Sequence, residues 1–269
     1  MKQLISALLA VLVLLSLSGC RRAAVPAAET TAAPVTETPA PETTTAAPAT
    51  TAPAAESETA PPSGTAAVTD RAEEGSVEES VGYRLVVPQV SAADPAAAQT
   101  INDYYTSVLG KLKDLAAGEV YEQAMNNHTV LMLTSAYETE CNRDGVLSLR
   151  RSATSADQSG GRDTVTWYAE TFNLANGGLY TLGDFFSVPE SGYAARLTGA
   201  VAAQIGDDPN HAQTYFDNWE TLVVSSFDAT QFYVTPDAVV VYYQAGALGR
   251  DAVFFTIPDK ELADILRRP

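Results

Sequence analysis

The chain of 269 residues contains only two cysteines and two histidines. Cys20 follows an apolar stretch at the start, so Cys141 is the one cysteine left for a folded domain, and we expect no disulfide within it. We interpret Cys141 as a buried structural thiol in a strand, with a reactive thiol as the alternative. His128 and His211 are far apart and lack the His-x-x-x-His spacing of a zinc site, so we expect both to be structural or exposed.

Motifs of catalysis and ion binding are also missing from the sequence. There is no Gly-x-Ser-x-Gly or Ser-x-x-Lys motif for a serine nucleophile, no Asp-x-Asp-x-Asp-Gly calcium loop, and no glycine-rich loop that follows a strand to hold phosphate. We therefore predict no catalytic residue, no metal site and no cofactor, and we expect that the protein is not an enzyme. A carboxylate-dependent hydrolase of the cell wall is the alternative, although no spacing of acidic residues singles out a pair.

Basic residues are scarce. The chain has 16 Lys and Arg against 33 Asp and Glu, for a formal net charge of -17. Such acidity disfavours nucleic acid and anionic lipid head groups as partners, and it favours basic proteins or cations. A contribution to solubility alone is the other explanation of this charge.

The one long hydrophobic run lies at the start of the sequence. After Lys2, residues 4–17 are almost wholly apolar and end in Leu17-Ser18-Gly19-Cys20. The run is too short for a comfortable membrane span, so residues 1–19 are predicted to be a signal peptide. The cysteine after Gly19 makes it resemble a bacterial lipoprotein signal, which implies a mature protein that begins with a lipidated Cys20. An ordinary signal peptide with an incidental cysteine is the alternative. Lipidation would anchor the chain at the extracellular face of the cytoplasmic membrane.

Aromatic residues are missing before Tyr83. Residues 20–80 consist mainly of Thr, Ala, Pro and Glu, a composition that cannot bury enough apolar surface to offset the entropy of ordering. We predict that residues 20–80 form a disordered, extended tether. Residues 81–269 have an ordinary globular composition and are expected to fold, with an amino-terminal half at 81–175 and a carboxy-terminal half at 176–269.

The globular part alternates hairpins with a few helices. Asp94-Pro95 is an N-cap followed by proline, and the apolar spacing after it predicts a helix that ends near Gly118 or continues to Met125. A helix at 193–205, a short helix after Asp208 as far as Trp219, and a terminal helix at 259–266 are also predicted. Strands are expected at 83–88, 130–140, 146–149, 164–172, 231–235, 239–243 and 252–257. This order predicts an α+β fold with antiparallel sheets and packed helices, in two closely associated halves.

Several local patterns occur in order along residues 81–267. They are Pro88-Gln89-Val90, Ile101-Asn102, Asp144-Gly145-Val146-Leu147-Ser148, residues 177–186, residues 232–237 and Phe255-Thr256-Ile257-Pro258. In that order they resemble the extracellular module shared by the RsiV-like lysozyme-sensing anti-sigma factors and the amino-terminal part of the PdaC-like peptidoglycan deacetylases. The resemblance implies an α+β fold and a role at the surface of Gram-positive bacteria. Because the sequence ends at Pro269, we expect no deacetylase domain after the module.

One loop departs from that family. Its members often carry a Gly-Gly-Ala-His-Gly-like loop in the first half, whereas this chain has Ser159-Gly160-Gly161-Arg162-Asp163. The histidine is missing, so the resemblance alone does not establish lysozyme binding.

Aromatic side chains are the candidates for a binding surface. Trp167, Tyr168, Trp219 and Tyr243 could line a groove for a protein or a glycan, although core packing is the commoner fate of such residues. We predict a non-enzymatic, lipid-anchored binding module for a basic protein such as lysozyme or for peptidoglycan. A lipoprotein that recruits another envelope protein is a further alternative.

Overall fold

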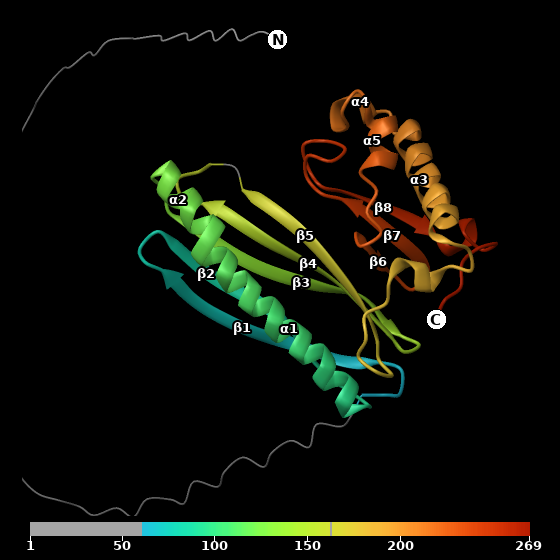
Figure 1. Cartoon of the computed structure of the whole chain (residues 1–269), viewed down its shortest axis with the longest axis horizontal. Helices are drawn as coiled ribbons and strands as arrows, with labels where there is room; N and C mark the ends of the chain where they lie inside the picture. The colour runs from blue at the N-terminus through green and yellow to red at the C-terminus, as the bar shows by residue number, and fades with distance from the viewer. Residues whose placement is uncertain (1–60, 162) are drawn as a thin grey trace, which may run out of the picture. The chain divides into compact units, whose positions relative to one another are not determined.

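The computed structural model of the chain describes residues 61–161 and 163–269 (Figure 1). The predicted signal peptide, Cys20 and the predicted tether as far as residue 60 lie outside these residues. The described part contains a five-stranded sheet, a three-stranded sheet and several helices, which confirms the α+β prediction. Among its helices, none has both the length and the apolar character that crossing a membrane requires.

The five-stranded sheet follows the order of the chain. Its strands are β1 (Ala66–Val77), β2 (Val81–Ala92), β3 (Leu131–Arg143), β4 (Val146–Asp157) and β5 (Thr164–Asn173). Three of the pairings are antiparallel, but β2 and β3 are parallel, with Val81 opposite Leu131. The predicted antiparallel pairing therefore holds for the other three pairs of this sheet, and the parallel pair of β2 and β3 is an exception to it. The helical segment between the two strands carries the chain back along the sheet, as a parallel connection requires.

Strand β1 corrects the predicted end of the tether. All twelve of its residues pair with β2, from Ala66 opposite Ala92 to Val77 opposite Val81. The strand escaped prediction because it lies at the sheet edge, where charged side chains are tolerated and protect against further pairing. Its Glu73 pairs with Lys113 at 2.9 Å, and its Glu74 pairs with Arg84 at 3.2 Å. The folded part thus begins before residue 80.

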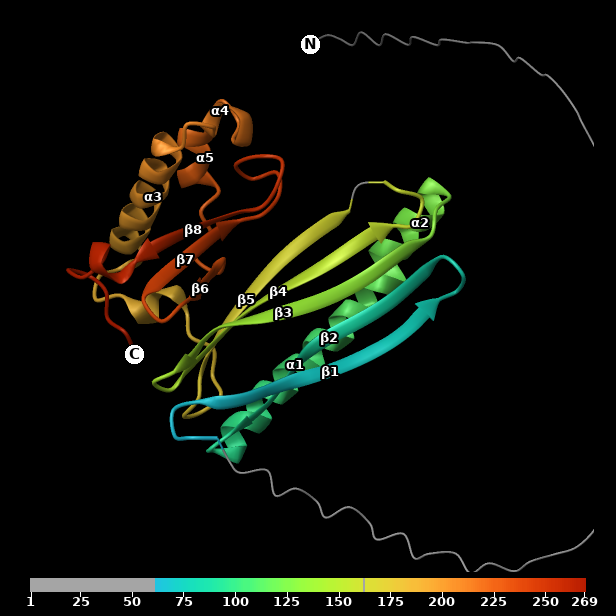
Figure 2. The ribbon, with the colours of Figure 1, turned by 180° about the vertical axis from the view of Figure 1, so that it is seen from behind.

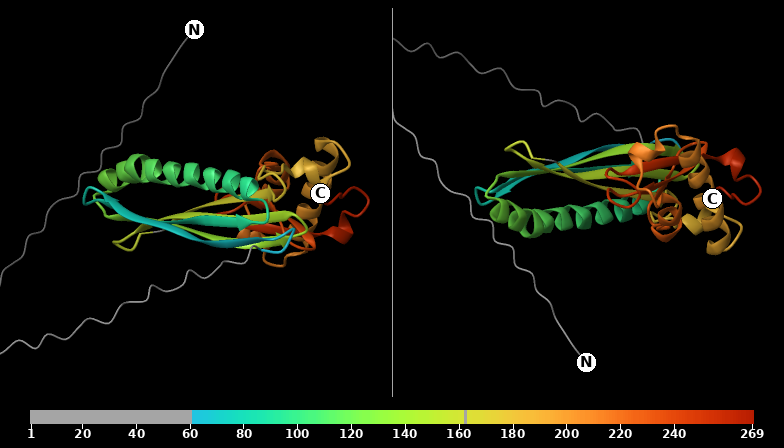
Figure 3. Two further views of the ribbon diagram at one scale, coloured as in Figure 1. Left: turned by 90° about the horizontal axis from the view of Figure 1, so that it is seen from below. Right: turned by 90° about the horizontal axis from the view of Figure 1, so that it is seen from above.

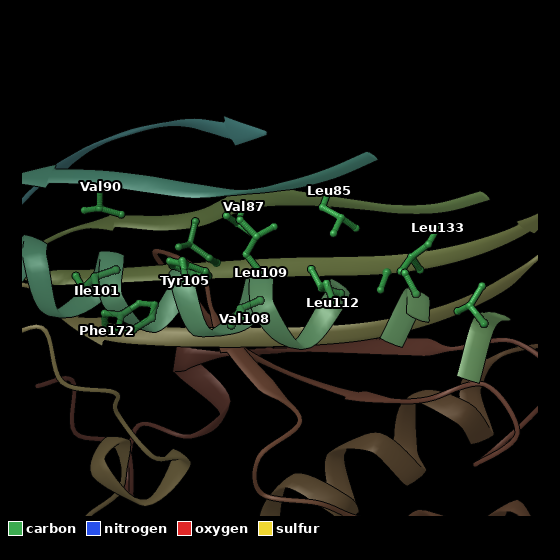
Figure 4. Close-up of a cluster of buried hydrophobic side chains, with 14 of the residues drawn as sticks. Leu85, Val87, Val90, Ile101, Tyr105, Val108, Leu109, Leu112, Leu133 and Phe172 are labelled. Carbon is green, nitrogen blue, oxygen red and sulfur yellow. The ribbon is translucent and has the colours of Figure 1, made fainter. Parts of the chain in front are cut away.

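One long helical segment covers a face of this sheet (Figure 3). Helix α1 (Pro95–Leu115) begins at Asp94, whose carboxylate accepts the backbone N–H of Ala96 at 2.8 Å. The helix continues through the π-helical turn η1 (Ala116–Val120) into α2 (Tyr121–Asn127). His128 closes α2 in a left-handed conformation, with φ 52°. Figure 4 shows the core between helix and sheet, where the buried side chains include Leu85, Val87, Ile101, Tyr105, Leu109, Leu112, Leu133 and Phe172.

The carboxy-terminal half contains the second sheet, which is antiparallel. It is formed by β6 (Phe232–Val234), β7 (Ala238–Tyr243) and β8 (Val253–Pro258). The helical elements are η2 (Leu182–Phe185), α3 (Glu190–Asp207), α4 (His211–Thr214), α5 (Trp219–Ser225) and η3 (Asp259–Glu261). The core of this half joins α3 and α5 to one face of the sheet through side chains such as Leu197, Val201, Val223, Val239 and Val241.

Two predicted helices of this half are wrong. The helix expected at 208–219 is interrupted after α4, where Tyr215 forms an antiparallel bridge with Gly249. The helix expected at 259–266 is reduced to the short turn η3, because Leu266 forms an antiparallel bridge with Phe186. In each case the next backbone N–H donates to a distant carbonyl: Phe216 to Leu248, and Arg267 to Phe185, both at 2.8 Å.

The second sheet lies beside β5, the edge strand of the first sheet, and contacts side chains of β5 on the face opposite α1 (Figure 2). Tyr233, Val240 and Tyr242 of the second sheet form a cluster with Trp167 and Ala169 of β5. The backbone N–H of Val234 also donates to the Oγ of Ser148 at 3.1 Å. These contacts confirm the expected close association of the two halves.

Candidate functional site

Strand β5 carries different kinds of side chain on the two faces of the first sheet. Consecutive side chains of a strand point to opposite faces, so Trp167 and Tyr168 cannot share one surface. Trp167 packs with the second sheet, whereas Tyr168 packs with the core under α1. The neighbouring strand β4 repeats this division with Arg150 and Arg151, which stack on Trp167 and Tyr168 respectively.

On the Trp167 face, an arginine is held among aromatic rings. The guanidinium carbon of Arg150 lies 5.0 Å from the centroid of the Trp167 ring and 5.1 Å from that of Phe254. Its Nε donates to Glu140 at 2.7 Å, and its Nη2 pairs with Glu138. These contacts hold Trp167 in a fixed orientation and leave part of its ring accessible.

The backbone of Trp167 is fixed from the other side by Gln244. The Trp167 N–H donates to the Gln244 Oε1 at 3.1 Å, and the Gln244 Nε2 donates to the Trp167 carbonyl at 2.6 Å. The side-chain amide therefore takes the place of a neighbouring strand at the free edge of β5.

An open cavity of about 400 Å³ lies beside these residues. We call it the Trp167 cavity; residues of its lining include Asp163, Val165, Trp167, Arg250, Asp251 and Phe254. Two aromatic rings thus stand next to two carboxylates and a guanidinium. This combination can hold a cationic side chain, through the ring faces and the carboxylates, or the apolar face of a sugar.

On the opposite face of the sheet, a buried ion pair joins β4 and β5. Arg151 and Glu170 each have only 4% of their side chain exposed. The Arg151 Nη2 donates to the Glu170 Oε1 at 2.6 Å, and the Nε donates to Oε2 at 3.1 Å. The hydroxyls of Tyr104 and Tyr105 also donate to this carboxylate, at 3.2 and 3.3 Å. Glu170 therefore accepts hydrogen bonds from three side chains.

Burial and charge set the protonation of this cluster. Burial raises the pKa of Tyr105 well above its ordinary value, and the negative charge of Glu170 raises it further. For Arg151, burial lowers the pKa, but attraction and hydrogen bonding by Glu170 outweigh it, so the net shift is upward. The cluster therefore consists of the Arg151 guanidinium and the neutral hydroxyls of Tyr104 and Tyr105 around the Glu170 carboxylate.

A second cavity, of about 320 Å³, lies beside the ion pair. We call it the Arg151 cavity; Val108, Lys111, Leu112 and Leu115 of α1 line one side, and Arg151, Tyr168 and Glu170 line the other. A further space of about 600 Å³ shares Tyr104 and Glu170 with it and extends to Tyr180, Tyr193 and Phe232.

The four aromatic residues predicted to bind a ligand do not form one groove. Trp167 lines the Trp167 cavity, and Tyr168 lines the Arg151 cavity. Trp219 begins α5 and is half-buried against the second core. Tyr243 is 1% exposed, and its hydroxyl donates to the Val223 carbonyl at 2.8 Å, so its prediction as a contact residue is wrong. Its inward direction on β7 makes it part of the core.

Arg151 and Glu170 were not singled out from the sequence. The signal that could have found them is their phase in the strands. Arg151 alternates with the buried Leu149 and Ala153, and Glu170 precedes the buried Phe172 by two positions. A charged residue in the inward phase of a strand requires a buried partner.

The remaining candidate groups lie apart from both cavities. Cys141 is buried and free, as expected of a structural thiol. His211 is the first residue of α4. Over residues 61–161 and 163–269, no group of three or more His, Cys, Asp or Glu side chains is placed to hold a metal ion.

Comparison with known proteins relates this fold to solved structures. No family model matches the chain, and no curated protein matches its sequence. A DUF3298 family protein from Pseudomonas aeruginosa matches with a TM-score of 0.53 and 12% identity, over 76% of this chain and 94% of that one. A member of the same family from Bacteroides fragilis has a TM-score of 0.49 and 12% identity, over 76% and 93%. At this identity the first likeness shows a shared fold alone, which is consistent with the module expected from the sequence.

Proposed function

We propose that this protein is a non-enzymatic binding module at the extracellular face of the cytoplasmic membrane, anchored through a lipid on Cys20. Its proposed ligand is a basic protein such as lysozyme, and the observation that supports this most is the Trp167 cavity. That cavity combines aromatic rings with the exposed carboxylate of Asp163 at an open surface. Lysine and arginine side chains of a basic partner suit this chemistry.

The arrangement of Arg150 supports the choice of a cationic ligand. This guanidinium stacks on Trp167 and Phe254, which shows that the rings accept a positive group, and Glu138 and Glu140 offset its charge. The net charge of -17 adds a long-range attraction that raises the rate of encounter with a basic protein. A neutral wall glycan would gain nothing from this long-range attraction.

The binding experiment uses the full chain and immobilised hen lysozyme across a salt series. We expect saturable binding that persists at about 0.15 M salt, where the Debye length is about 8 Å. Isolated peptidoglycan is tested in parallel. Binding to peptidoglycan alone would replace lysozyme with a wall ligand, and binding to neither would contradict the proposal.

The non-enzymatic part of the proposal has its own test. The chain is incubated with peptidoglycan, and soluble fragments are measured; we expect none above background. Release that a single carboxylate substitution abolishes would establish the alternative, a wall hydrolase. Recovery of one stoichiometric envelope protein in a pull-down would instead favour a recruiting lipoprotein.

The lipid anchor is tested by mass and by fractionation. In a bacterial host that lipidates proteins, we expect the mature chain to begin at Cys20, to carry acyl chains and to remain with the membrane. Cys20→Ser should release it. A wild-type chain that is found unmodified in the medium would contradict the anchor.

A further inference from the structure

We propose that the space of about 600 Å³ beside Tyr104 binds a small neutral ring compound, whose carboxamide pairs with the backbone of Ala169. We call this space the Ala169 cavity. It shares no lining residue with the Trp167 cavity, so the inference is independent of the function proposed above. Three features point to this ligand: an open position at the edge of β5, the group that fills the neighbouring position, and the aromatic lining of the cavity.

The outer edge of β5 has no neighbouring strand, because β5 is the last strand in the order of its sheet. Every second residue of an antiparallel strand turns both its N–H and its C=O to the same edge. Trp167 turns both groups to Gln244, and Thr171 turns its C=O to the N–H of Tyr180 at 2.7 Å. Ala169 lies midway in an unshifted register and has the same orientation. Among the described residues, neither a loop nor a side chain supplies it with a hydrogen bond there.

The cavity reaches this edge. It is lined by three consecutive residues of β5, Ala169, Glu170 and Thr171, whose side chains point to alternate faces. A space that touches all three therefore follows the edge of the strand. Ala169 remains partly exposed although its methyl group packs against the second sheet, and the exposed Thr181 and Thr230 at the lining leave the cavity open to solvent.

Gln244 indicates what such an edge position accepts. Its Oε1 accepts the N–H of Trp167 at 3.1 Å, and its Nε2 donates to the C=O of the same residue at 2.6 Å. A primary carboxamide can form both bonds because one of its N–H groups lies beside its C=O. A cyclic amide has the same arrangement, whereas the N–H and C=O of a trans amide point in opposite directions. A carboxylate lacks the donor.

The rest of the lining favours a flat, neutral ring. Its aromatic members are Tyr104, Tyr180, Tyr193 and Phe232. Tyr193 stacks on Phe186 with ring centroids 4.9 Å apart, so its ring is held in place for a further ring to pack against. Glu190 is exposed, and no lining residue is Lys, Arg or His, so an anion finds no counter-charge within the lining. The volume lies within the range of small-molecule sites.

The test is an NMR titration of the isotope-labelled full chain with two probes, nicotinamide and 2-pyridone. Nicotinamide carries its carboxamide on a ring, whereas 2-pyridone contains the amide within the ring, so the tighter probe identifies the form of the ligand. We expect at least one of them to bind saturably at one site. The N–H signal of Ala169 should shift downfield on binding, because this group acquires a hydrogen bond.

Hydrogen exchange at Ala169 gives a second readout. In the free protein its N–H should exchange at least about tenfold faster than that of Tyr168, which faces β4, and a saturating probe should slow it about tenfold. Two analogues serve as controls. N,N-dimethylnicotinamide keeps the ring and the carbonyl without an N–H, and nicotinate has a carboxylate instead. Both should bind at least about tenfold more weakly.

Variants locate the site. Ala169→Pro removes the outward N–H, which an edge strand tolerates, and should weaken binding about tenfold. Gly183→Leu fills the cavity and should weaken binding to a similar extent, which keeps the test decisive if Ala169→Pro does not fold. A Cβ at Gly183 would lie 3.7 Å from the Tyr193 ring, an ordinary contact. The control is Gly199→Leu, at an exposed position of α3 where a Cβ meets nothing within 4 Å, and it should leave binding unchanged.

Several outcomes would overturn the inference. Absence of saturable binding for both probes would contradict it, as would equal binding of either analogue. An Ala169 N–H that exchanges as slowly as that of Tyr168 in the free protein would show that this edge is closed. Binding that leaves the Ala169 signal in place, or that a folded Gly183→Leu protein retains in full, would place the ligand elsewhere.

Discussion

At the scale of single residues, the fold depends on a buried ion pair between Arg151 and Glu170. Two charges have been removed from water, and the cost is offset only while the pair and its hydrogen bonds remain complete. Arg150, the next residue, forms pairs with Glu138 and Glu140 nearer the solvent. The two arginines therefore provide a comparison of a fully buried and a partly buried charge within one strand.

Glu170→Gln should be strongly destabilising, because it leaves the Arg151 charge buried without a counter-charge. We expect a loss of about 3–5 kcal/mol in the free energy of unfolding, measured by urea denaturation. The matched control is Glu138→Gln, whose side chain is 69% exposed and should cost less than about 1 kcal/mol. Similar losses for both variants would contradict the special role of the buried pair.

The buried tyrosines predict how stability depends on pH. Burial, with the charge of Glu170, raises the pKa of Tyr105 well above its ordinary value of 10.0. Above about pH 10 the unfolded chain loses the phenol proton and the folded chain keeps it, so the unfolded state binds fewer protons. The contribution of this group is therefore complete below about pH 10 and is lost as the pH rises further.

Tyr105→Phe isolates that contribution. Each buried tyrosine should remove about 1.4 kcal/mol of stability per pH unit above pH 10. The variant should thus show an alkaline slope that is shallower by this amount, in urea denaturations at several pH values above 10, even though loss of a donor to Glu170 lowers its stability at pH 7. Identical slopes for wild type and variant would show that Tyr105 does not stay protonated.

At the scale of elements, some pieces were predictable because their signals are local. The hairpin between β3 and β4 has a local signal in Asp144-Gly145, because both residues have positive φ, 55° and 82°, as a two-residue hairpin turn requires. Helix α1 was predicted from its cap at Asp94 and its apolar spacing. In each case the information lies within a few residues of the element.

Other elements depend on distant partners. Strand β1 has the polar composition of the segment before it, and only pairing with β2 makes it a strand. The segment after β5 also depends on a distant contact: Gly177 has φ 74°, and its backbone approaches the start of α1. Local sequence patterns do not predict such close contacts between distant segments of the chain.

Gly177→Ala tests this contact. A Cβ at this position would lie 2.5 Å from the Ala97 carbonyl oxygen and 2.7 Å from the Thr100 Cβ. Gly145 also has positive φ, but a Cβ there would meet nothing within 4 Å, so Gly145→Ala measures the backbone strain alone. We expect Gly177→Ala to cost about 1–3 kcal/mol more than Gly145→Ala in urea denaturation. Equal costs would mean that the loop does not pack on α1.

At the scale of the whole molecule, the class of fold could be predicted, but the candidate sites only in part. Alternation along β5 separates Trp167 from Tyr168, so the predicted groove became two cavities. Arg151 and Glu170 meet only because β4 and β5 pair, with Arg151 opposite Tyr168 in register. Composition indicated an acidic protein, but it could not locate where the acidic residues meet aromatic rings.

The central claim is that a basic protein binds at the Trp167 cavity, and the most direct test is a charge reversal at its rim. Asp163→Lys changes an exposed carboxylate of the cavity. The control, Asp114→Lys, makes the same change of charge on an exposed position of α1, which covers the other face of the sheet. Both variants alter the long-range field of the protein equally, so a difference between them reports local contact.

The measurement is the affinity of each full-length variant for hen lysozyme at about 0.15 M salt, where long-range attraction is largely screened. We predict that Asp163→Lys weakens binding about tenfold or more, a loss of about 1.4 kcal/mol, and that Asp114→Lys changes it less than about twofold. Equal effects of the two variants, or no effect of either, would contradict binding at the Trp167 cavity.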